Sequence, residues 1–357
     1  MDLSAYTTLR LGGPARRLVE ARTEQELIDA VRAADAAGEP LLVLGGGSNV
    51  VIADEGFDGT VVRVLTAGVE IADSDVLHVA AGEPWDPFVA RCVEEGRSGI
   101  EALSGIPGSV GATPIQNVGA YGQEVSETLV AVRAYDRRSG EVVEMAPEEC
   151  GFGYRTSVFK RDPGRRVVLR VSFRLPRTGT SAPIRYAELA RKLGVEPGAT
   201  VPVAQVREAV LALRRGKGMV LDPDDPDTRS AGSFFTNPIL DPDRFEALRA
   251  RVRERLGEEE EPPAFPEPDG RIKTSAAWLI ERAGFRRGQG DPNGIAISSK
   301  HVLALTNRGA GTTRELVALA WRIADGVFEA FGVELHPEPV FVGHDWPAMT
   351  RGGTTRR

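Results

Sequence analysis

The sequence has few cysteines and no long apolar run. These features argue against a disulfide-rich, zinc-binding or membrane-spanning protein. Its two cysteines, Cys92 and Cys150, lie far apart and form no CxxC pair, so neither a disulfide framework nor a zinc site is expected. The four histidines show no metal-ligand spacing. No apolar run reaches membrane-spanning length, and residues 1–6 lack the basic start and apolar stretch of a signal peptide. We therefore expect a cytoplasmic protein that binds no metal.

The charge balance lacks the basic excess of a nucleic-acid-binding protein. The 357 residues include 44 Lys and Arg against 51 Asp and Glu, a net charge of −7. This balance disfavours nonspecific nucleic-acid binding, and it allows a small anionic ligand only where cations gather locally. The length suffices for two or three domains.

A glycine-rich turn is the first candidate site. The apolar strand Leu41–Leu44 runs into Gly45–Asn49 (GGGSN), and Val50–Ile52 is again extended. The turn is neither GxGxxG nor a P-loop, because Val50 occupies the third glycine position and no GK[ST] follows. Successive N–H groups in such a turn can still bind an anion. The turn therefore predicts a phosphate site, with a bare structural turn as the alternative.

A second glycine-rich stretch, Ala102–Gln123, contains no charged side chain. Its two prolines and its polar residues argue against a membrane span. Glycines let the backbone approach a phosphate or a large flat ligand closely. A buried uncharged core loop is the alternative interpretation. The five glycines of this stretch are Gly105, Gly108, Gly111, Gly119 and Gly122.

The remaining pattern predicts an α+β protein. Thr23–Ala37 is a helix with a Thr23–Glu26 capping box, and residues 200–215 form an amphipathic helix. Between residues 60 and 175, one helix at Pro87–Glu95 interrupts short strands that we assign to a mixed sheet. These strands are Val61–Val64, Val76–Ala80, Val130–Tyr135, Val142–Met145 and Val167–Phe173. After residue 230 the pattern is α/β, with helices at Asp241–Leu256, Ser275–Ala283 and Thr313–Phe331 and strands near Ile295–Ile297 and Val302–Leu305.

Two acidic loops interrupt this pattern. Asp222–Asp227 resembles a calcium loop only superficially, because Asp227 and Ser233 stand where the loop requires Gly and Glu. Gly257–Gly270, with four consecutive glutamates, is expected to be a solvated loop.

Three short segments carry candidate catalytic residues. Arg155 lies in a glycine- and aromatic-rich segment, Gly151–Lys160, and could fork onto a carboxylate. Ser233 and Asn237 flank two phenylalanines, and Glu338 lies between two prolines that hold it extended. The alternatives are a surface salt bridge, a strand edge and an exposed terminal glutamate.

The order of these segments is more specific than any of them alone. From Thr8 to Gly343, the succession GGGSN, SGIPGSVGATPIQNVGAYG, GFGYR-S-FK, AGSFF-NP and L-x-PE resembles the UDP-N-acetylenolpyruvoylglucosamine reductase (MurB) family of peptidoglycan synthesis. The resemblance implies a flavin-binding domain of the vanillyl-alcohol-oxidase type and a C-terminal α/β substrate domain. It divides the chain into a first FAD-binding subdomain at 1–60, completed by 333–345, and a second at 61–215. A substrate-binding α/β domain at 216–332 and a tail at 346–357 follow.

The resemblance also implies the cofactors and their residues. FAD would be bound noncovalently, and NADPH would supply the hydride that passes through it to an enolpyruvyl ether of a UDP-sugar. The uncharged loop would strengthen the few hydrogen bonds that tune the flavin. The implied FAD-binding residues are Gly45, Gly46, Gly47, Ser48, Asn49, Gly105, Gly108, Gly111, Ala112, Ile115, Asn117, Gly119, Ala120 and Tyr121.

Matching positions assign three catalytic residues. Ser233 would donate a proton to C2 of the substrate, and Arg155 and Glu338 would lie on the side of its enolic carboxylate. Three further residues would bind substrate: Tyr186 covers the uridine diphosphate, Lys217 neutralises phosphate, and Asn237 donates or accepts a hydrogen bond.

The sequence departs from the family pattern at two places, and other functions remain open. Glu281–Arg282 stands where an amide side chain is expected, and the Glu258–Glu261 loop resembles an insertion. The alternatives are another FAD-dependent oxidoreductase on the same fold and a non-catalytic nucleotide-sugar binding protein. We expect a monomer whose partners are small molecules, with neither nucleic acid nor membrane.

Overall fold

The computed structural model describes residues 1–347, and the chain divides into two compact units. Unit 1 contains Met1–Thr7, Pro14–Ser48 and Phe57–Pro223. Unit 2 contains Thr8–Gly13, Asn49–Gly56 and the chain from Asp224 onward. The division between Ser48 and Asn49 therefore falls inside the first glycine-rich turn.

Unit 1 begins with a small parallel sheet in the order β1 (Ala15–Ala21), β4 (Phe57–Val64), β2 (Leu41–Leu44). Helix α1 (Glu24–Ala36) connects β1 to β2 and starts with the predicted Thr23–Glu26 capping box. Its buried face consists of Leu27, Ile28, Val31 and Ala34, as the 3.6-residue period requires. The sequence analysis missed β1, whose two arginines and one glutamate obscure the strand pattern.

The second sheet of unit 1 has five strands, and all of its pairs are antiparallel. The prediction of one mixed sheet over residues 60–175 was wrong. β4 pairs in parallel within the first sheet, whereas short turns connect the later strands and permit antiparallel pairing. In order across the sheet, the strands are β10 (Glu141–Met145), β9 (Leu129–Asp136), β11 (Arg166–Arg174), β6 (Val76–Ala80) and β5 (Val69–Ile71).

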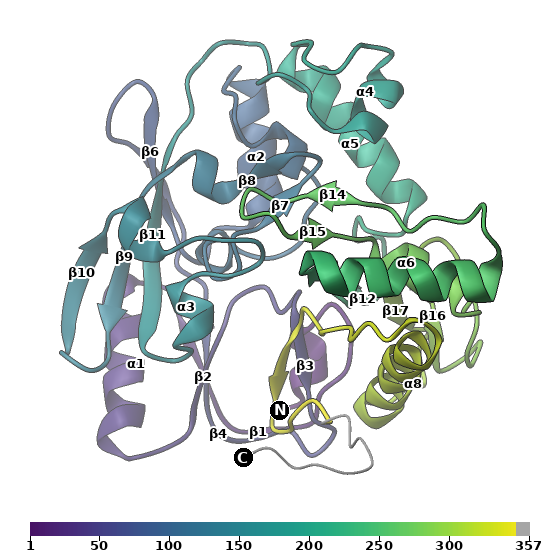
Figure 1. Ribbon diagram of the computed structural model, residues 1–357. Coiled ribbons are helices and arrows are strands. Elements are labelled where there is room, and N and C mark those ends of the chain that lie inside the picture. The colour runs from purple at the N-terminus through teal and green to yellow at the C-terminus, as the bar shows by residue number, and fades with distance from the viewer. Residues whose placement is uncertain (348–357) are drawn as a thin grey trace. The chain divides into compact units, whose positions relative to one another are not determined.

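The other helices of unit 1 pack against the five-stranded sheet or against one another (Figure 1). Trp85 and Phe88 of α2 (Trp85–Glu94) pack on Phe173 of β11, with ring centroids 5.9 and 5.7 Å from it. α4 (Ala187–Leu193) and α5 (Val203–Gly216) pack side by side over a separate apolar cluster that includes Leu189, Val206 and Val210. The one-turn helix α3 (Val158–Arg161), capped by the Ser157 side chain, was not predicted. A short hairpin of β7 (Gly119–Ala120) and β8 (Gln123–Glu124) follows the uncharged loop.

In its described residues, up to 347, unit 2 combines small sheets with three α-helices, α6 (Pro242–Leu256), α7 (Ala276–Arg282) and α8 (Thr313–Phe331). α8 begins and ends at the predicted residues, and its Thr312–Glu315 capping box is present. One sheet is antiparallel, with the order β12 (Ser230–Ser233), β17 (Ala304–Asn307), β16 (Ile295–Ile297). A second sheet contains β13 (Ile239–Leu240), β15 (Ile272–Lys273) and β14 (Phe265–Pro266). β3 (Val50–Ile52) pairs in parallel with β18 (Val340–Val342), which the sequence analysis missed.

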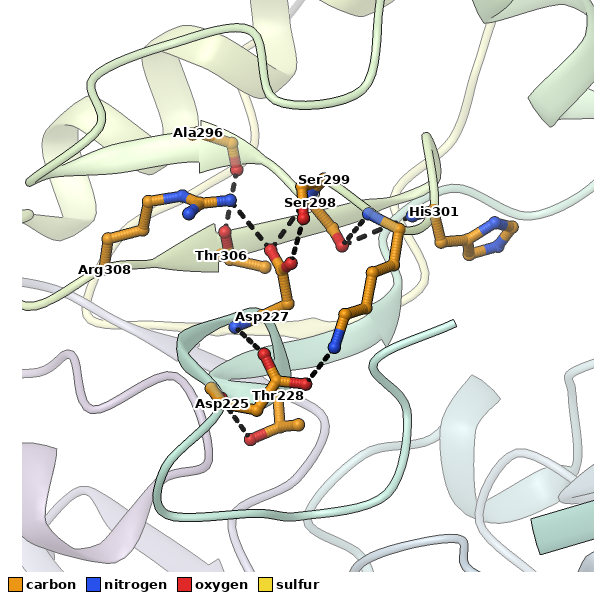
Figure 2. Close-up of polar contacts among 10 residues, drawn as sticks. Asp225, Asp227, Thr228, Ala296, Ser298, Ser299, His301, Thr306 and Arg308 are labelled. Carbon is orange, nitrogen blue, oxygen red and sulfur yellow. Dashed lines mark hydrogen bonds and ion pairs between the residues drawn. The ribbon is translucent and has the colours of Figure 1, made fainter. Parts of the chain in front are cut away.

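The acidic loop that leads into β12 is held by cations of its own unit. Figure 2 shows Asp227 between Arg308, which donates to it at 2.8 Å, and Ser299, whose backbone N–H donates at 3.1 Å. Asp225 pairs with Lys300 at 2.5 Å. These contacts fix the loop beside the ends of β16 and β17 and account for two of its four carboxylates. Among residues 1–347, no group of His, Cys, Asp and Glu could hold a metal ion.

Within the described part of the chain, no helix combines the length and the apolar character needed to cross a bilayer.

Candidate functional site

In unit 1 the two glycine-rich loops touch. The hydroxyl group of Ser48 donates to the carbonyl oxygen of Pro107 at 3.0 Å. A Cβ atom on Gly46 would lie 2.6 Å from the Cα atom of Gly108, far inside the van der Waals limit. At Gly45 the atom nearest to such a Cβ is the Ser109 hydroxyl oxygen, which can rotate away. A side chain at Gly46 would fill the contact between backbones, so glycine is required there by the close approach of the two loops.

The first loop presents a row of backbone donors. Among the described residues, the N–H groups of Gly45, Gly46, Gly47 and Ser48 donate no hydrogen bond. Gly47 has a φ of +62°, so the turn combines left-handed and ordinary backbone, as in anion-binding nests. Backbone donors in a partly buried turn normally find a partner. This row fits the phosphate groups of a dinucleotide.

The second loop is anchored by its backbone to the start of α2 and to β6. Asp86 accepts from the N–H group of Gly105 at 2.6 Å, and Trp85 donates to the carbonyl oxygen of Gly108 at 3.0 Å. Arg207 of α5 forks onto the Asp86 carboxylate at 2.6 and 3.0 Å. Burial raises the pKa of Asp86, but the bonds from Arg207 and Gly105 outweigh it and leave this pKa below its usual value. Asp86 therefore stays ionised and holds the loop in place.

Strained backbone is concentrated at the predicted site. Of the described non-glycine residues, four have positive φ, and three of them are predicted site residues: Asn117 at 48°, Tyr121 at 50° and Arg155 at 52°. Each such conformation costs about 1–2 kcal/mol for an L-residue. The surrounding hydrogen bonds must offset this cost, which indicates a backbone shaped for function.

Arg155 is tied to the uncharged loop. Its guanidinium group donates to the carbonyl oxygens of Gly119 at 2.6 Å and Asn117 at 3.4 Å. The Asn117 side chain is buried and donates to Glu124 at 2.7 Å while it accepts from the N–H group of Ser126 at 3.1 Å. The hydroxyl group of Ser157 donates to the carbonyl oxygen of Ile115 at 2.5 Å. The amide of Asn117 thus serves the shape of the loop itself.

A second group in unit 1 unites Tyr121 with the two predicted substrate residues Tyr186 and Lys217. The tyrosine rings meet edge to face, with centroids 5.6 Å apart. The Lys217 ammonium group lies 5.6 Å from the Tyr121 ring centroid and 2.7 Å from the carboxylate of Glu188. Burial raises the pKa of Tyr121 to about 12 and also raises the pKa of Tyr186, so both phenols stay neutral at physiological pH. The Tyr186 side chain is nevertheless 46% exposed, unlike most large rings of the protein.

In unit 2 the structure brings Ser233 and Glu338 to one place. The N–H group of Glu338 donates to the carbonyl oxygen of Phe234 at 2.8 Å, and Phe235 and Pro337 form the adjoining bridge. Both side chains are half-buried. The neighbouring Phe234 and Phe235 are buried, with ring centroids 5.2 Å apart. The backbone thus brings two half-buried polar residues next to a buried aromatic pair.

The two predicted asparagines of unit 2 have clear local partners. The Asn49 side-chain amide reaches the carbonyl oxygen of Glu338 at 3.5 Å, and Val340 donates to the Asn49 carbonyl at 2.9 Å. The Asn237 side chain accepts from the N–H group of Ala276 at 3.0 Å, at the start of α7. Asn49 therefore supports the Glu338 segment, and Asn237 helps to hold the first turn of a helix.

Comparison with known proteins identifies the family. A model described as FAD binding domain matches residues 15–146, and one described as UDP-N-acetylenolpyruvoylglucosamine reductase, C-terminal domain, matches residues 224–342. A reductase of that name from Streptomyces coelicolor is 60% identical over 96% of this chain and 89% of its own. The counterpart from Thermobifida fusca is 60% identical over 96% and 97% of the two chains. The chain belongs to the UDP-N-acetylenolpyruvoylglucosamine reductase family.

A solved structure agrees with this membership. The UDP-N-acetylenolpyruvylglucosamine reductase (MurB) of Thermus caldophilus superposes with a TM-score of 0.63 at 26% identity, covering 96% of this chain and 97% of that one. The predicted resemblance and the predicted fold class, a flavin-binding domain followed by the family's C-terminal domain, are confirmed.

The two departures from the reductase pattern lie on the surface of unit 2. Glu281 and Arg282 are exposed, and Arg282 pairs with Glu260 at 3.3 Å. In the same loop Glu261 bridges Arg249 and Arg253 of α6, and hydrogen bonds from Arg249 and Arg253 lower its pKa to about 2. The expected solvated loop is thus pinned to α6 and α7 by ion pairs.

Sequence reasoning missed three residues that hold predicted site residues in place. Asp86 and Arg207 hold the uncharged loop, and Glu188 holds Lys217. The signal for Glu188 was present, because it stands two positions after Tyr186. No sequence signal connected Asp86 with Arg207, which come together only through the packing of α2 on α5.

Proposed function

We propose that the protein reduces UDP-N-acetylglucosamine enolpyruvate to UDP-N-acetylmuramate, a step of peptidoglycan synthesis. Family membership at 60% identity over nearly the whole chain carries this conclusion. The family's cofactors are FAD and NADPH. When bound, FAD would supply the hydride-transfer chemistry that amino-acid side chains lack.

The described residues fit the cofactor. The free N–H groups of Gly45–Ser48 suit the FAD pyrophosphate, because backbone donors bind anions without a cationic side chain. The loop from Gly105 to Tyr121 contributes backbone and small side chains, namely Gly108, Gly111, Ala112, Gly119 and Ala120, together with Ile115. Neither loop contains His or Cys, the residues that would tether a flavin covalently, so we assign noncovalent FAD.

Ser233, Arg155 and Glu338 are the proposed catalytic residues. A serine hydroxyl is a weak acid, so Ser233 donates its proton only to a strongly basic carbon formed in place, C2 of the substrate. Arg155 supplies positive charge where the substrate carboxylate gains electron density, an effect worth roughly 3–4 kcal/mol per donor. Glu338 acts on the same carboxylate, either as the protonated acid or through a water molecule, because two bare carboxylates would repel.

Tyr186, Lys217 and Asn237 are proposed to bind the sugar nucleotide. The exposed Tyr186 ring offers a face to the uridine diphosphate, and Lys217 offers a cation. Lys217 and Arg155 supply the local positive charge that an acidic protein needs for an anionic ligand.

The remaining assignments concern the whole molecule. We assign FAD binding to residues 1–60, completed by 333–345, and to 61–215, and substrate binding to 216–332, with 346–357 as a tail. Residues 348–357 of that tail lie outside the described part of the chain. We further propose a cytoplasmic monomer that takes small molecules and binds neither nucleic acid nor membrane.

A visible spectrum and one labelled turnover test this function. The purified protein should be yellow and should release its flavin into trichloroacetic acid; a colourless protein that binds no added FAD would exclude every flavoenzyme assignment. A single turnover in deuterated water should place solvent-derived deuterium at C2 of the lactyl ether. Label at C3 in place of C2 would contradict the assigned order of hydride and proton addition.

A further inference from the structure

The ion pair between Glu188 and Lys217 has no place in the function proposed so far. The Lys217 ammonium group contacts the Glu188 carboxylate at 2.7 Å, and the two side chains are 29% and 31% exposed. Lys217 immediately follows α5, and Glu188 lies in the first turn of α4. The pair thus joins two helices that already pack on each other.

The surroundings of this pair resemble a ligand site more than a structural clasp. Lys217 lies 5.6 Å from the Tyr121 ring, and the exposed ring of Tyr186 stands against the same tyrosine. Tyr121 also holds a strained φ of 50°. A pair that served only to join the helices would not need an exposed aromatic ring and strained backbone around it.

The net charge of this ion pair indicates a specific role for Glu188. A contact ion pair is neutral, so Lys217 paired with Glu188 offers an incoming anion little net attraction. A diphosphate group carries more than one negative charge and accepts several charge-assisted hydrogen bonds, which lets it compete with a single carboxylate. A singly charged anion lacks this advantage.

We propose that Glu188 is the resident counterion of Lys217, and that the diphosphate of a nucleotide ligand displaces it when the ligand binds. Glu188 thereby lowers the affinity of the site and makes it selective for diphosphates over singly charged anions. This inference rests on the proposed role of Lys217 as a phosphate-binding residue. The diphosphate could belong to the uridine nucleotide or to the pyridine nucleotide.

Calorimetric titration of the purified, FAD-loaded protein tests the exchange, with UDP and NADP⁺ as separate probes. Glu188→Gln should tighten binding of at least one probe by about two- to five-fold, because the pair to be broken is partly exposed and worth little. Glu208→Gln is the matched control, since Glu208 is an exposed residue of α5 and its loss changes net charge equally. It should leave both dissociation constants unchanged.

Lys217→Ala distinguishes this inference from the proposed phosphate-binding role of Lys217 on which it rests. Lys217→Ala should weaken the binding of the same probe. In a protein that already carries Lys217→Ala, Glu188→Gln should raise the affinity by a smaller factor, because no ion pair remains to be broken. If Lys217→Ala changes neither affinity, the phosphate-binding role of Lys217 is wrong. Two results would overturn only the proposed displacement of Glu188, provided that Lys217→Ala weakens binding. In the first, Glu188→Gln tightens the binding of neither probe. In the second, Glu188→Gln tightens binding by the same factor whether or not Lys217 is present.

Discussion

Glu338 donates its backbone N–H to the carbonyl oxygen of Phe234 at 2.8 Å, one residue beyond Ser233. This bond joins two segments that are far apart in the sequence, and the Phe235–Pro337 bridge continues the pairing. The neighbouring Asn49 reaches the Glu338 carbonyl as well. Backbone bonds therefore hold together the two segments that carry the proposed catalytic groups.

Ser233→Ala separates the two half-reactions. Only protonation of the substrate needs the hydroxyl group. NADPH should therefore reduce the flavin of the variant at a rate within about two-fold of the wild-type rate. Reoxidation by the enolpyruvyl sugar nucleotide should slow by roughly 10²–10⁴. Stopped-flow absorbance of the flavin measures both rates. Ser230→Ala, three residues earlier on β12, is the control, and normal reoxidation in the Ser233 variant removes Ser233 from the mechanism.

Gly46→Ala tests the cradle formed by the two loops. The new Cβ atom would lie 2.6 Å from the Cα atom of Gly108, and a backbone neighbour cannot move aside cheaply. The loops should separate and FAD retention should fall, measured as the ratio of flavin to protein absorbance after gel filtration. Gly216→Ala is the control, because nothing lies within 4 Å of a Cβ atom there. Full flavin content in the Gly46 variant would contradict the proposed pyrophosphate site.

Much of this arrangement could be predicted from the sequence, because local signals determine it. α1 and α8 carry capping boxes and clear apolar faces, and their ends matched the prediction within a residue. The two glycine loops were identified because glycine without charge is unusual at a surface.

Other parts depend on distant partners and could not be predicted. β18 exists because Val340–Val342 finds β3, and its sequence alone resembles any short extended segment. The pairing of β4 within a separate parallel sheet depends on β1, whose charged residues hide its strand character. The Asp86–Arg207 pair likewise requires α2 to pack on α5.

Arg155→Lys tests whether the guanidinium fork is needed or charge alone suffices. Lysine keeps the positive charge but cannot reach the carbonyl oxygens of Gly119 and Asn117 together. We expect kcat to fall by about 10²–10³, with a change in Tm of only a few degrees. Arg161→Lys is the matched control, since Arg161 directly follows the segment that contains Arg155, is exposed and also donates to a carbonyl oxygen, that of Gly151. Equal turnover in both variants would leave Arg155 with a structural role alone.

Glu95 lies outside the proposed site, and Glu95→Gln should cause a loss of stability that depends on pH. Hydrogen bonds from Arg97, then from Arg91 and Arg177, lower the pKa of Glu95 to about 2, and Arg97 is 1% exposed. A depressed folded-state pKa stabilises the protein above the unfolded value of about 4.3, and this contribution disappears as the pH falls toward 2. The variant should lose roughly 1–3 kcal/mol at pH 7 in urea unfolding, and the difference from the wild type should shrink by more than half at pH 3. Glu94→Gln, its exposed neighbour, should cost little at either pH. A loss in the Glu95 variant that stays constant from pH 7 to pH 3 would show that packing around Arg97, and not the charge of Glu95, accounts for the effect.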